Sequence, residues 1–214
     1  MTLPTEFIQQ PKAVSSYEFS DLASGTAYQK FYLTNTISGS VLIDNATYGD
    51  RVWTKAQEIG GTGIILTNTF GVLFKKPQDI KGELVVSIPT ARFQGGGSTT
   101  TDQLIITAQK LSGGTTTNIM SVSSEILSTT TGSVTEFRDT IGLTMPLTHY
   151  KIDDELKIRV EYKVVTASGN NHTVWFAQDP MNRKTDTKDN ATPTARTFVI
   201  DTISEAYVPF RIDI

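Results

Sequence analysis

The sequence predicts an all-β protein: an antiparallel β-sandwich of jelly-roll type, with one short helix and an extended N-terminal arm. Threonine makes up about 15% of the residues, well above average usage, and its stiff β-branched side chain suits a pleated strand. Residues 155–165 alternate between apolar and charged side chains, the period of a strand with one buried face. Clusters of Gly, Asn, Asp and Ser separate about ten such segments, as in sandwiches and barrels.

The remaining strands are expected where shorter apolar or alternating runs occur. In chain order they are residues 28–33, 64–67, 72–74, 83–88, 104–109, 120–127, 174–177, 198–203 and 208–214. Between several of them, glycine-rich stretches supply residues that tolerate positive φ, and these stretches predict loop tips.

A single stretch, residues 50–59, predicts a helix. Asp50 is a suitable N-cap, Val52, Ala56 and Ile59 recur on one side, and two glycines follow the stretch. We expect this helix to cover one end of the sandwich.

The chain divides into an N-terminal arm, residues 1–25, and one β-sandwich domain, residues 26–214. The arm has two prolines and no clean period, and its aromatic side chains are scattered: Phe7, Tyr17 and Phe19. Such a segment suits an extended arm on the surface of a neighbouring subunit. The alternative is a first edge strand packed on its own domain.

Composition excludes several functional classes. The 19 basic and 22 acidic side chains leave a formal charge of −3, so no basic surface indicates nucleic-acid or membrane binding. Cysteine is absent, which excludes disulfides, thiolate metal sites and cysteine nucleophiles. No apolar run is long enough for a membrane span and the N-terminus does not resemble a signal peptide, so we expect synthesis in a cytoplasm.

The sequence contains no recognisable set of catalytic residues. His149 and His172 are the two histidines, and neither accompanies the G-x-S-x-G turn of a serine hydrolase. Adjacent Asp153 and Asp154 favour a turn over the acid and base pair of a glycosidase. We therefore expect a protein that is not an enzyme and has no cofactor or metal, although a calcium site built from separate loops stays open.

The two tryptophans raise the alternative of a sugar-binding surface, because aromatic faces stack on pyranose rings. Trp175 has apolar neighbours on both sides, which favours a buried or subunit-facing strand. Trp53 lies in the expected helix and is expected in the core.

Three short phrases resemble uncharacterised structural proteins of tailed-bacteriophage virions. They are SYEFSDLASGT at residues 16–26, the DP-x-NR turn at 179–183, and VPFRIDI at 208–214. The resemblance implies a jelly-roll-like sandwich built into a particle as a trimer or larger ring, and it brings no catalytic residues. The chain lacks a coiled-coil extension, which favours a capsid decoration, collar or fibre-head domain over an elongated tail fibre.

These inferences predict a structural virion protein, made in the host cytoplasm, that assembles with copies of itself and with other capsid or tail proteins. The alternative function is a module that binds a host glycan. The assembly contacts are expected in the arm and the last strand, at Phe7, Tyr17, Phe19, Val208, Phe210 and Ile212.

Overall fold

A computed structural model describes residues 26–36, 39–96, 99–129, 132–167, 169, 171–185 and 197–211. In chain order its strands are β1 (Thr26–Thr36), β2 (Gly39–Ile43), β3 (Trp53–Ile59), β4 (Gly63–Leu73), β5 (Gln78–Gln94), β6 (Thr100–Ser112), β7 (Thr115–Ser123), β8 (Leu127–Thr129), β9 (Val134–Tyr150), β10 (Glu155–Thr166), β11 (Asn171–Ala177) and β12 (Glu205–Arg211). The predicted all-β class is confirmed.

The predicted helix at residues 50–59 is wrong. Trp53–Ile59 is strand β3, which pairs antiparallel with β11 along its whole length, from Trp53 opposite Ala177 to Ile59 opposite Asn171. The apolar spacing of the segment is compatible with a helix, but pairing with β11 satisfies its backbone and buries Trp53, and these long-range contacts override a local signal.

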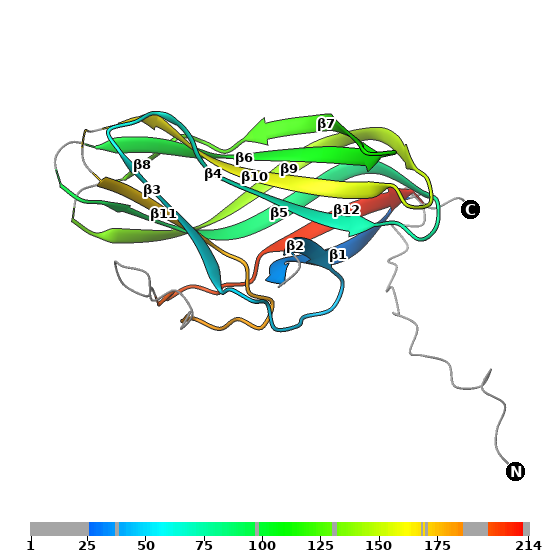
Figure 1. The fold of residues 1–214 in the computed structure, drawn as a ribbon, viewed down its shortest axis with the longest axis horizontal. Helices are drawn as coiled ribbons and strands as arrows, with labels where there is room; N and C mark the ends of the chain where they lie inside the picture. The colour runs from blue at the N-terminus through cyan, green and yellow to red at the C-terminus, as the bar shows by residue number, and fades with distance from the viewer. Residues whose placement is uncertain are drawn as a thin grey trace, which may run out of the picture.

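The strands form one open, mixed sheet in the order β3-β11-β5-β12-β1-β2-β4-β10-β6-β7, with β8 paired to β6 and β9 paired to β5. All the pairs are antiparallel except β2 with β4, which meet in parallel at one position, Val41 opposite Gly71. In Figure 1, β6 and β7 lie along one side of the molecule, and β1, β2 and β12 lie on the other. The single β2 and β4 contact therefore joins two extensive groups of strands.

The core brings together side chains from strands that are not neighbours in the sheet. Phe70 of β4 and Phe176 of β11 belong to strands that are not neighbours, yet their ring centroids lie 6.2 Å apart, edge to face. Both side chains belong to one large apolar cluster that draws on strands from both groups. Burial of this cluster provides the main favourable contribution to folding.

A second, smaller apolar cluster lies on the opposite face of β11. Because side chains alternate along a strand, Val174 and Phe176 point into the main core while Trp175 points the other way. Trp175 packs there in a cluster with Trp53 and Phe198. Both tryptophans are buried, as expected for Trp175 from its apolar neighbours and for Trp53 as a core residue.

Several strand boundaries differ from those expected. The expected strand 64–67 and all but the last residue of the expected strand 72–74 are parts of β4, whereas β2 and β9 were not expected. Residues 198–203 are not a strand; the carboxylate of Glu136 accepts hydrogen bonds from the backbone N–H groups of Val199, at 3.0 Å, and Ile200, at 2.9 Å. The predicted arm, residues 1–25, lies outside the described residues, and the division into arm and domain stays a prediction.

No helix long and apolar enough to cross a membrane occurs in the described part of the chain.

Replacing Phe176 with Ala should lower the free energy of unfolding by about 3–5 kcal/mol, because the ring is 1% exposed and its removal leaves a cavity between the two groups of strands. Val199→Ala, at a side chain that is 86% exposed, is the control and should change stability by less than about 0.5 kcal/mol. Urea unfolding of both variants measures this, and equal losses would contradict the place of Phe176 in the core.

Candidate functional site

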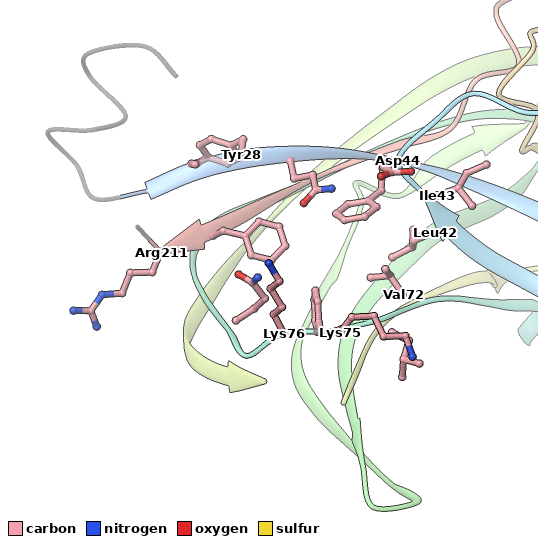
Figure 2. Close-up of a pocket in the computed structure, with 15 residues that line it drawn as sticks. Tyr28, Leu42, Ile43, Asp44, Val72, Lys75, Lys76 and Arg211 are labelled. Carbon is pink, nitrogen blue, oxygen red and sulfur yellow. The ribbon is translucent and has the colours of Figure 1, made fainter. Parts of the chain in front are cut away.

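A pocket of about 1000 Å³ opens where β2 and β4 diverge (Figure 2). These strands are paired only at Val41 and Gly71, so beyond that point their backbones separate and leave a gap. The end of β12 and the start of β1 close the other side, with Thr26 opposite Arg211. Its volume is at the upper end of the range of ligand pockets, about 300–1,000 Å³.

The inner wall of the pocket is apolar and rigid. Phe74 packs edge to face against Tyr150, with centroids 5.0 Å apart, and against Phe210, 6.0 Å apart. Figure 2 shows Leu42 and Val72 next to each other at the inner end. Apolar groups from four elements therefore line this wall: Ala27, Phe31, Leu42, Val72, Phe74 and Phe210.

The rim of the pocket is polar and mostly basic. Lys75 Nζ lies 3.5 Å from Asp153 Oδ1, and both side chains are exposed, so this ion pair contributes little to stability. Lys76 is exposed and forms no ion pair within the described residues. Arg211 lines the outer end, and Figure 2 shows its guanidinium directed away from the pocket.

The expected assembly residues fall in different places. Phe210 is half-buried and lines the pocket, whereas Val208 is fully buried in the main core and contacts its own chain. The others, Phe7, Tyr17, Phe19 and Ile212, lie outside the described residues. The pocket itself was not foreseen, because its lining comes from segments far apart in the sequence.

A buried polar cluster lies on the inner side of β5, toward its opposite end. The Arg92 guanidinium is fully buried, and its Nε donates to Asp102 Oδ1 at 2.8 Å. Nη2 donates to Asp139 Oδ2 at 3.2 Å and Nη1 donates to Thr90 Oγ1 at 3.1 Å. The ring of Phe137 lies 4.6 Å from the guanidinium carbon. Each side of the guanidinium therefore has a polar partner or an aromatic face.

Asp102 joins this cluster to β10 and β11. The hydroxyl of Tyr162 donates to Asp102 Oδ1 at 2.8 Å, and His172 Nε2 lies 3.1 Å from Asp102 Oδ2. Burial alone would raise the pKa of Asp102, but the His172 ring and the charge of Arg92 outweigh it and hold that pKa below its ordinary value. Burial raises the pKa of Tyr162 well above its usual value, so Tyr162 stays a hydrogen-bond donor.

The other expected titratable residues have structural partners. His149 is exposed, with Nδ1 2.6 Å from Asp79 Oδ1. Asp154 Oδ2 accepts from the backbone N–H of Lys151 at 2.8 Å, in the turn that the paired aspartates predicted. Within the described ranges no three His, Asp or Glu side chains are grouped to hold a metal ion.

No known protein family and no curated protein matches the sequence. Solved structures do match. An aminopeptidase from the marine sediment archaeon Thaumarchaeota archaeon has a TM-score of 0.59 and 7% identity, over 88% of this chain and 37% of that chain. An α-amino acid ester hydrolase has a TM-score of 0.57 and 11% identity, over 86% of this chain and 36% of that chain. A CocE/NonD family hydrolase from Staphylococcus aureus has a TM-score of 0.50 and 11% identity, over 86% of this chain and 37% of that chain.

These matches contradict the expectation that the chain is not an enzyme, because the structures that share its fold at a TM-score of 0.50 or above include an aminopeptidase and two other hydrolases. The expectation rested on the absence of catalytic motifs from this sequence. The present chain spans little more than a third of each neighbour, 36–37%, and at such low identity the likeness shows the fold alone. The resemblance to tailed-phage virion proteins stays a prediction.

The Asp102→Asn variant should lose about 3–5 kcal/mol of stability at neutral pH, because it removes one partner of a buried ion pair. The pKa of Asp102 is lower in the folded chain than the unfolded value of about 3.9, so its ionised form favours folding. This contribution is complete above about pH 5 and is lost as the pH falls below about 4.

Chemical unfolding of wild type and Asp102→Asn between about pH 7 and pH 3 measures the effect. The difference between the two curves should become smaller toward the acid end, because Asp102 loses its stabilising charge there. Asp153→Asn, at an exposed carboxylate, serves as the control and should follow the wild type throughout. Parallel curves for wild type and Asp102→Asn would contradict the assignment.

Proposed function

We propose that the chain is a β-sandwich of jelly-roll type and a structural virion component of a tailed phage, which assembles through the pocket at its open end. The edge-to-face contact of Phe70 with Phe176, across strands that are not sheet neighbours, supports two packed layers. The occupant is a segment of a neighbouring subunit, from another copy or from another capsid or tail protein.

The pocket carries this proposal. A gap of about 1000 Å³ with phenylalanine rings in its wall interrupts the close packing that is usual in protein interiors. It lies where β1 begins and β12 ends, so segments attached at residues 26 and 211 start beside it. A segment of the same type from a neighbouring copy would fill this pocket and cover the half-buried ring of Phe210.

The charges on the rim favour a particular kind of occupant. Lys76 is exposed beside the apolar wall and Lys75 has only an exposed partner, whereas Asp44 is the acidic residue in the lining. An aromatic segment flanked by a carboxylate complements this arrangement. The predicted arm combines these features, because Phe7 follows Glu6 and Phe19 follows Glu18.

Strand edges offer a second contact of the same kind. β9 is seventeen residues long and pairs with β5 alone among the described strands, so its other edge has free backbone groups. Such edges accept strands from other chains. A ring of subunits could therefore combine edge pairing with filling of the pocket.

Solution mass by light scattering across a dilution series tests the assembly proposal. Wild type should form a trimer or larger closed ring. Val72→Trp should shift the equilibrium toward monomer, because the indole fills the pocket, and deletion of residues 1–22 should do the same because it removes the proposed occupant. Ile64→Trp, on an exposed side chain at the other end of β4, should leave the mass unchanged.

A monomeric wild type at every concentration would overturn self-assembly through the pocket. Unchanged assembly after the deletion would overturn the role of the arm, and unchanged assembly in Val72→Trp would overturn the role of the pocket.

The fold likeness favours a second candidate, a domain that takes part in hydrolysis. His149 paired with Asp79 at 2.6 Å is an oriented, accessible imidazole of the type that serves as a general base. If the chain cleaves p-nitrophenyl acetate or amino acid esters, His149→Gln should lower kcat/KM about 100-fold or more. Lys163→Gln is the control, and equal rates in all three proteins would exclude this role for His149.

A further inference from the structure

A second pocket lies on the outer face of the sheet, distant from the open end. It has a volume of about 320 Å³ and is lined by residues of β3, β11, β5 and β9. The lining consists of three apolar side chains and four polar ones, Lys55, Gln57, Phe93, Val134, Asn171, Thr173 and Trp175.

Strand register places these side chains on one face. Gln57 lies opposite Thr173, Thr173 opposite Phe93, and Phe93 opposite Val134, so one straight row crosses all four strands. Two residues along, Lys55 lies opposite Trp175. Alternate residues of a strand share a face, so Thr173 and Trp175 of β11 point outward together with their partners on the neighbouring strands. Val174, which lies between them, points into the core.

The apolar side of this pocket is held in place by packing. Trp175 is 7% exposed and belongs to the second apolar cluster, against which Phe93 also packs. Phe93 itself is half-buried, and Val134 is 39% exposed. The pocket therefore offers a fixed apolar surface that requires little ordering when a ligand binds.

The polar side chains of this pocket provide both hydrogen-bond donors and hydrogen-bond acceptors. Gln57 and Asn171 are exposed and each carries an amide with two donors and one acceptor oxygen, while Lys55 adds a charged donor. Each hydroxyl of a sugar can donate one hydrogen bond and accept others, so side-chain amides, which also do both, suit it. The C–H face of the same ring suits an aromatic wall.

We propose that this outer pocket, defined by Gln57, Phe93, Asn171 and Trp175, binds a single pyranose ring of a saccharide. The volume is at the lower end of the range for ligand pockets, which fits one ring and excludes a large ligand. The site is separate from the open-end pocket, so a subunit could bind sugar on its sheet face while its open end is occupied.

Saturation-transfer NMR on the full chain tests the proposal, with a panel of methyl glycosides of glucose, galactose, mannose, N-acetylglucosamine and glucuronic acid as probes. At least one glycoside should receive saturation when aromatic protons are irradiated. Gln57→Ala and Asn171→Ala should each weaken its binding about tenfold, because each removes a hydrogen-bonding amide. Asn45→Ala, an exposed amide outside the pocket, is the matched control and should bind as the wild type does.

Thermal unfolding of the same variants checks that they are folded, which is expected because Gln57 and Asn171 are exposed. Absence of saturation transfer to every glycoside would overturn the proposal. Saturation transfer that Gln57→Ala and Asn171→Ala leave unchanged would also overturn it. A third contrary result would be that the chain binds an unglycosylated peptide and no sugar, and that these two variants weaken the binding of the peptide. None of these outcomes bears on assembly, which is measured by mass.

Discussion

The buried guanidinium of Arg92 constrains the rest of this molecule. Removing such a charge from water costs several kcal/mol, and the cost is offset only where every donor has a well-placed partner. Here the partners come from different parts of the sheet: Asp139 lies on β9, whereas Asp102 lies on β6 and accepts also from Tyr162 of β10. The two groups of strands must therefore meet in one alignment, because a slip of one residue would leave a buried charge without its partner.

This cluster and the open-end pocket lie toward opposite ends of β5. Arg92 is close to the end of the strand, whereas Gln78 at its start lines the pocket. Fourteen residues of extended chain separate them, about 45 Å. At one end, hydrogen-bonded charges hold the two groups of strands together. At the other end, the backbones of β2 and β4 pair only at Val41 and Gly71 and then separate. The molecule is thus closed at the end that holds the buried charges and has its pocket at the other end.

The sequence predicted those elements whose two faces differ in chemistry. β10 was evident because charged side chains alternate with Leu156, Ile158 and Val160. β9 was missed because its inward residues, such as Ile141 and Leu143, are separated by Gly, Thr and Pro, which weaken a strand pattern.

The candidate sites were harder to predict because they depend on contacts across the fold. Trp53 was expected in the core and is buried, but within a strand in place of a helix, since only the pairing with β11 decides between the two. Phe210 was singled out for its place near the end of the chain, and the pocket that it lines depends on where β2 and β4 diverge. No local pattern records the row that Gln57, Thr173 and Phe93 form across three strands.

The pairing of β1 with β12 has a consequence for the order of folding. Thr26 lies opposite Arg211, so the sheet cannot close until nearly the whole described chain is present. Most other strand partners are also far apart in sequence, and such a topology folds slowly because loop closure precedes the contacts that stabilise it. During synthesis the edge of β1 that pairs with β12 would stay unpaired until β12 is made, and the growing chain would expose apolar strands until then. The yield of folded protein in a cell therefore depends on how long the incomplete sheet avoids aggregation with other incompletely folded chains.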